Sequence, residues 1–279
     1  MPSNITLALL QNTPLLFANY GGVQLPKLRG EHTLYGNPNA IRVDCTAAAM
    51  AANGVASVTF APGGGGDTIY LSYFNDQISS VRLTDPPPAG VTLFTTDNLS
   101  GCKFFVDRIT GSNDLIVYHA NARALSPPSN QGAANPTLET VAATAELNRL
   151  HTAAQGDWTA ANAGMVLAAG GSVDKPHYQM GPGGKVQHKR GMGRTRIPNP
   201  AEAPDPNRLN EPEWIGGTVI FGFYNGGWQF HYQSWGAVEY RRPGKAPKGW
   251  FGNRNVQANT MRLAGRGQIY PLPATNVVV

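Results

Sequence analysis

Short runs rich in β-branched and aromatic residues follow one another closely through the first half of the chain. They cover residues 68–74, 78–83, 91–95, 102–109 and 115–119, and turn residues separate them. Runs of this length and composition are typical of β-strands. A further pair, 218–224 and 228–234, flanks Asn225-Gly226-Gly227 and is the strongest hairpin signal in the chain.

Two segments predict helices. One is the alanine-rich stretch 44–54, which Asp44 can cap at its start and Gly54 at its end. The other runs from about residue 136 to 154, with Asn135 as the cap and Pro136 in the first turn. The pattern therefore predicts an α/β protein, with a mixed, largely antiparallel β-sheet or sandwich flanked by helices.

Residues 171–213 break this pattern. They hold several basic side chains, few large apolar groups and many prolines and glycines, which predicts a long basic Gly/Pro-rich loop or flexible excursion. The chain is long enough to bury a substantial core, as one large domain or one and a half, and residues 1–279 are expected to form a single domain.

Composition narrows the function classes. Hydrophobic residues make up 41% and charged residues 14% of the chain, as in a lightly charged globular protein. The net charge of +5 suits an acidic protein partner or a weak attraction to anionic surfaces. No RNA-recognition, zinc-finger or helix-turn-helix pattern supports nucleic-acid binding. No apolar run approaches 18 residues, so no membrane span is expected. No basic residue precedes the first apolar stretch, so no cleaved signal peptide is expected either.

The chemistry is expected at Cys102 and His119, which lie on the two arms of a predicted hairpin around residues 110–113. In a β-hairpin, the residue numbers of each directly opposed pair add up to the same sum. A sum of 221 puts Cys102 directly across from His119, at roughly 5 Å, and a sum of 223 makes them diagonal neighbours, at roughly 7–8 Å. An even sum would send the two side chains to opposite faces, so the loop length decides whether they meet.

A thiol and an imidazole side by side can form an activated nucleophile, because the imidazole takes the thiol proton. The Thr96 hydroxyl can orient the imidazole, and backbone amides around Ser100, Gly101 and Cys102 can face an oxyanion. The alternative is that Cys102 is a small apolar strand residue. Cys45, at the start of the predicted 44–54 helix, is a second and weaker candidate nucleophile. Histidine and cysteine spacings match no metal site, and no cofactor is expected.

Thr96, the run Leu99-Ser100-Gly101-Cys102 and His119 together resemble the signature of the cysteine glutamine deamidases. This family includes the catalytic domain of cytotoxic necrotizing factor, Burkholderia lethal factor and the chemotaxis receptor deamidase. The resemblance covers about 30 residues, a tenth of the chain. It implies that Cys102 is the nucleophile, His119 the general base and then acid, and Thr96 the orienting residue.

By this resemblance we expect a bacterial toxin or effector, delivered to the host cytosol, that deamidates a glutamine of a host protein to glutamate through a thioester. A small GTPase or a translation-initiation helicase is the kind of substrate the family suggests. The residues leave two alternatives open. One is a thiol protease or a transglutaminase-like acyltransferase that uses the same pair, and the other is a non-enzymatic binding protein.

Overall fold

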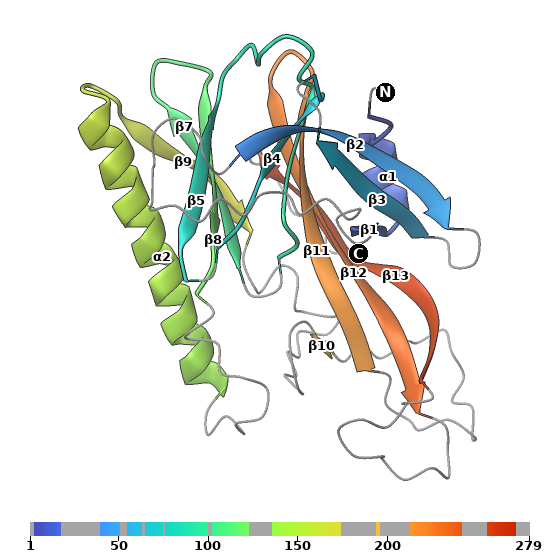
Figure 1. The fold of residues 1–279 in the computed structure, drawn as a ribbon. Coiled ribbons are helices and arrows are strands. Elements are labelled where there is room, and N and C mark those ends of the chain that lie inside the picture. The colour runs from blue at the N-terminus through green and yellow to red at the C-terminus, as the bar shows by residue number, and fades with distance from the viewer. Residues whose placement is uncertain are drawn as a thin grey trace.

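The computed structural model describes residues 3–17, 40–50, 55–62, 65–74, 76–99, 102–122, 136–173, 194–195, 213–241 and 256–271, which form two β-sheets and two helices (Figure 1). The larger sheet has the order β1 (Leu15–Phe17), β3 (Val55–Pro62), β2 (Ala40–Met50), β4 (Thr68–Leu71), β6 (Leu93–Thr96), β11 (Glu213–Tyr224), β12 (Trp228–Arg241) and β13 (Val256–Tyr270), and β10 (Arg194–Thr195) pairs with β11. The smaller sheet has the order β5 (Ile78–Leu83), β8 (Leu115–Ala120), β7 (Lys103–Ile109) and β9 (Leu167–Val173). The helices are α1 (Leu7–Asn12) and α2 (Pro136–Ala161).

The described strands confirm the prediction of a sheet-rich, largely antiparallel protein. Among the described pairings, only β1–β3 and β4–β6 are parallel. The two sheets face each other and curl into a half-barrel (Figure 1). The predicted hairpin at 218–234 is β11–β12, where Tyr224 pairs with Trp228 around the Asn225–Gly227 turn.

Three apolar clusters hold these layers together. The first fills the space between the two sheets and includes Phe94 and Phe230 from the larger sheet and Phe104 from the smaller one. The second lies between the larger sheet and the N-terminal segment of α1 and β1. The third lies between the smaller sheet and α2, whose Trp158 contributes to it, so that α2 covers the outer face of the smaller sheet (Figure 1). Each sheet therefore has apolar side chains on both of its faces.

The predicted helix at 44–54 is wrong, because residues 44–50 belong to strand β2 and residues 51–54 lie outside the described part. Val43 and Cys45 are fully buried and Asp44 between them is half-buried, which is the period-two alternation of a strand. Alanine favours helices by less than about 1 kcal/mol per residue. Pairing of residues 44–50 with β3, in a strand whose start at residues 40–43 also pairs with β4, outweighs that small preference.

The second predicted helix is present as α2, which continues seven residues beyond the predicted end at 154. The flanking layer is therefore thinner than expected: within the described residues it consists of α2 and the single short helix α1. The predicted loop at 171–213 lies mostly outside the described residues. Where it is described, residues 171–173 end β9, residues 194–195 form β10, and residue 213 begins β11.

The β7–β8 hairpin settles the register that the sequence left open. Phe104 lies opposite His119, so that opposed positions add up to 223. Ile109 and Asp114 close the hairpin through a backbone hydrogen bond of 3.1 Å, leaving a four-residue loop at 110–113. Gly111 within this loop has φ of +79°, a conformation that L side chains rarely adopt. The loop length thus selects the diagonal arrangement of Cys102 and His119.

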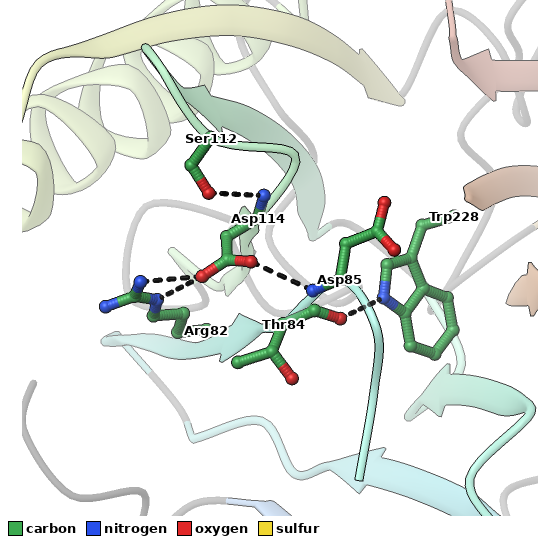
Figure 2. Close-up of polar contacts among 6 residues, drawn as sticks. All are labelled: Arg82, Thr84, Asp85, Ser112, Asp114 and Trp228. Atoms are coloured by element: carbon green, nitrogen blue, oxygen red, sulfur yellow. Dashed lines mark hydrogen bonds and ion pairs between the residues drawn. The ribbon is translucent and has the colours of Figure 1, made fainter. Parts of the chain in front are cut away.

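A polar network joins the two sheets at the turn end of this hairpin (Figure 2). Asp114 accepts two hydrogen bonds from the Arg82 guanidinium, at 2.9 and 2.6 Å, and a third from the Asp85 backbone amide at 2.9 Å. The indole of Trp228, from the larger sheet, donates to the Thr84 carbonyl at 3.0 Å. These contacts anchor the segment after β5 against the larger sheet and keep the sheets in fixed relative positions.

A close backbone approach joins the open edges of the two sheets. A Cβ built on Gly171 of β9 would lie 2.1 Å from the Ile269 carbonyl oxygen of β13. A glycine is therefore required where these two strands cross. No helix in the described ranges is long and apolar enough to cross a membrane.

Candidate active site

Cys102 and His119 lie on the inner face of the smaller sheet, which looks toward the larger sheet. Cys102 comes directly before β7, and Phe104, two residues on, pairs with His119 in β8. Side chains two positions apart in a strand share a face, so Cys102 and His119 are diagonal neighbours on one surface. Cys102 and Phe104 both belong to the cluster between the sheets. The expectation that an odd register sum puts the thiol and the imidazole on one face is confirmed.

Thr96 reaches this surface from the opposite sheet, where it is the last residue of β6. Its Oγ1 lies 2.6 Å from Nδ1 of His119, so the predicted contact between this hydroxyl and the imidazole is present. The chain reaches the second sheet within the next few residues, because Leu99 still pairs with Thr218 of the larger sheet and β7 begins at Lys103. This short crossing places the end of β6 against β8.

The hydrogen bonds of Thr96 determine the tautomer of His119. The Thr96 hydroxyl donates its one proton to the Leu71 carbonyl at 2.7 Å. It must therefore accept the proton of His119, which places the imidazole hydrogen on Nδ1 and the lone pair on Nε2. Nε2 is buried and has no hydrogen-bond partner among the described residues. An imidazole held in this way can accept a proton at Nε2, as a general base does.

The site is deeply buried. Thr96 and His119 have no exposed surface and Cys102 is 2% exposed. Burial lowers the pKa of His119 from 6.5 to about 4, and the nearby Asp97 carboxylate offsets part of this shift. The imidazole is therefore neutral at pH 7. A thiolate at Cys102 would favour the imidazolium, so ionisation of the thiol and protonation of His119 are coupled.

Asn121 is a site residue to which sequence reasoning assigned no role. Its side-chain Nδ2 donates to Sγ of Cys102 at 3.1 Å. The signal was available, because the register that sums to 223 puts position 121 opposite position 102, and residues 119 and 121 share a face of the strand. The sequence alone left that register undecided between two odd sums.

Two further residues surround His119. Ser79 of β5 pairs with His119 from the other side of β8, and its buried Oγ has no hydrogen-bond partner within the described ranges. The ring of Tyr73 stacks on the imidazole with a centroid distance of 5.4 Å and an interplanar angle of 22°. The Asp97 carboxylate accepts a hydrogen bond from the Tyr73 backbone amide at 3.0 Å, which fixes this segment over the imidazole. Neither the β5–β8 pairing nor the position of Tyr73 can be predicted from local sequence.

Two sequence-based candidates have different outcomes. Ser100 and Gly101, expected to supply oxyanion-binding amides, lie outside the described residues. Cys45 does not begin a helix; it lies within β2 opposite Phe60, with no exposed surface. Burial, with a contribution from Asp67, raises the pKa of the Cys45 thiol far above its usual value. No helix N-terminus is present to activate Cys45, so this second and weaker candidate nucleophile is not supported.

The chain matches no protein-family model and no curated protein. The resemblance to the deamidase signature therefore depends on the residues of this site themselves. Within the described ranges, no three histidine, cysteine, aspartate or glutamate side chains come together as a group that could hold a metal ion.

Proposed function

We propose that the protein is a thiol-dependent amidohydrolase that converts a glutamine side chain of another protein to glutamate. The observation that carries the proposal is the hydrogen bond from His119 Nδ1 to Thr96 Oγ1, which leaves the lone pair on Nε2 of an imidazole that shares a sheet face with Cys102. An oriented imidazole beside a thiol is the arrangement that nucleophilic catalysis requires. The resemblance of residues 96–119 to the cysteine glutamine deamidases supports a carboxamide as the substrate.

The residues can carry a balanced reaction. His119 Nε2 takes the proton of the Cys102 thiol as sulfur attacks the carboxamide carbon. The carbon–nitrogen bond then breaks, and ammonia leaves with the proton that His119 returns, which gives a thioester. Water attacks the thioester while His119 accepts one of its protons. The carbon–sulfur bond breaks and His119 returns its proton to the thiol. The glutamic acid product then releases the second proton of the water to solvent as it ionises to glutamate.

The burial of Cys102 places a condition on this reaction. A protein side chain can reach a thiol that is 2% exposed only if part of its cover moves. The imidazole beside it is covered by Tyr73, which is itself half-buried and stacks on the ring. Substrate binding is therefore expected to displace the Tyr73 ring from His119.

The test is mass spectrometry of host proteins incubated with the purified protein, with small GTPases and translation-initiation helicases as the first substrates to examine. Deamidation adds about one dalton to a glutamine-containing peptide, because an amide becomes an acid. We expect this gain with the native protein and its loss in both Cys102→Ala and His119→Ala. Cys45→Ala is the matched control, since it removes the other cysteine of the chain, and it should keep the activity.

Three results would contradict the proposal. Deamidation that persists in Cys102→Ala would exclude Cys102 as the nucleophile. Cleavage of the peptide chain would indicate a protease instead. Incorporation of an added amine without hydrolysis would indicate an acyltransferase, because an amine then replaces water in resolving the thioester.

A further inference from the structure

The side chain of Asn121 is held in one orientation beside the sulfur of Cys102. Its Oδ1 accepts a hydrogen bond from the Asp76 backbone amide at 3.2 Å, and its own backbone amide donates to the Gln77 carbonyl at 2.8 Å. These contacts come from the segment that joins β4 to β5. Turning the amide over would place Nδ2 against the Asp76 N–H, two donors face to face, so the NH₂ end must point at the sulfur.

This contact matters because Cys102 is almost fully buried. Burial disfavours the thiolate, which is the form that attacks a carbonyl carbon. Cys45 shows the effect of burial in the same protein, where burial and a nearby carboxylate raise the pKa of the thiol. A hydrogen bond donated to a charged group is stronger than one to a neutral group, so an N–H aimed at sulfur favours the thiolate over the thiol.

We propose that Asn121 is a positioning residue that stabilises the thiolate of Cys102 by donating from Nδ2 to Sγ, and that the β4–β5 segment holds this amide in place. The inference deepens the proposed function, since it concerns the same nucleophile. It adds a fourth member to the group formed by Cys102, His119 and Thr96. It also links the reactivity of the thiol to the β4–β5 connection, because Asp76 and Gln77 there orient Asn121 and Tyr73 stacks on His119.

The test is a pH titration of the Cys102 thiolate by its ultraviolet absorbance, in a Cys45→Ala background so that Cys102 is the one remaining cysteine. The Cys45→Ala, Cys102→Ala double variant supplies the baseline. Because this readout needs neither a substrate nor a reagent, the burial of the sulfur does not limit it.

We expect Asn121→Ala to move the titration midpoint of Cys102 upward by about one to two pH units, as loss of a hydrogen bond to a charged group predicts. Asn121→Asp keeps the shape of the side chain and places a negative charge beside the sulfur, so it should move the midpoint upward at least as far. The matched control is Asn162→Ala. The Asn162 amide, directly after α2, donates to the Trp158 carbonyl at 2.9 Å on the outer side of the smaller sheet, and its loss should leave the midpoint unchanged.

An unchanged midpoint in either folded Asn121 variant would overturn the proposal. The Asp variant keeps the test decisive if the Ala variant does not fold. An upward shift together with a failure to deamidate any glutamine would support the role of Asn121 and refute the proposed substrate chemistry. The two conclusions can therefore fail separately.

Discussion

The buried imidazole of His119 predicts a specific loss of stability in mild acid. Burial lowers the pKa of His119 from 6.5 to about 4 in the folded protein, whereas the unfolded chain keeps the ordinary value. Between these two values, the unfolded state binds a proton that the folded state does not. The free energy of unfolding is therefore highest above about pH 6.5, where His119 is neutral in both states. It falls as the pH is lowered toward 4, because protonation of the imidazole favours the unfolded chain.

The magnitude follows from the two pKa values. One pKa unit corresponds to about 1.4 kcal/mol, so the full effect is about 3 kcal/mol once the pH is below both values. Between pH 7 and pH 5 the same linkage gives a loss of about 2 kcal/mol. This is a substantial part of the stability of a typical domain, which is about 5–15 kcal/mol.

The assay is urea unfolding at pH 7 and pH 5 of the native protein and of His119→Gln, which has no titrating group at this position. The variant will be less stable at both pH values, because it loses the bond to Thr96. Its loss of stability between pH 7 and pH 5 should be smaller than that of the native protein by about 2 kcal/mol. The contributions of the other titrating groups to the pH dependence are the same in both proteins and cancel. They include that of His231, because burial also lowers the pKa of His231. Equal pH dependence in the two proteins would refute the reasoning, because it would mean that the folded state accepts the proton freely.

Two further predictions concern the site and the junction of the sheets. Thr96→Val removes the acceptor for Nδ1 of His119 and should lower the rate of deamidation by about 100-fold or more, whereas Thr96→Ser keeps the hydroxyl and should retain most of the rate; equal rates in both variants would rule out the orienting role. Gly171→Ala places a methyl group against the Ile269 carbonyl and should destabilise the fold by about 1–3 kcal/mol in urea unfolding. Gly156→Ala, on α2 with open space around it, should leave stability unchanged or raise it by up to about 1 kcal/mol, so a similar loss in both variants would contradict the predicted clash.

Local sequence was sufficient for the hairpins. β-branched and aromatic runs around turn residues predicted both arms at 102–109 and 115–119, and the Asn225-Gly226-Gly227 turn predicted β11 and β12. Each of these elements pairs with its neighbour along the chain, so its partner is already present in the local pattern. The same locality made it possible to place Cys102 and His119 on one face, once a register was assumed.

Local sequence failed where the partner is distant. Residues 44–50 resemble a helix when taken alone, and only pairing with β3 makes them a strand. Ser79 lies beside His119 because β5 pairs with β8, an arrangement that no nearby residue specifies.

The sequence by itself determined which side chains are available for chemistry and limited the thiol and imidazole to a few registers. The tertiary structure decided the rest. The four-residue loop selected one register, and the packing of the two sheets brought Thr96 within 2.6 Å of His119. It also buried the imidazole, which lowers its pKa to about 4. The physical reason is that neighbouring residues alone determine how side chains alternate between the two faces of a strand. Burial and contacts between sheets depend on the whole chain.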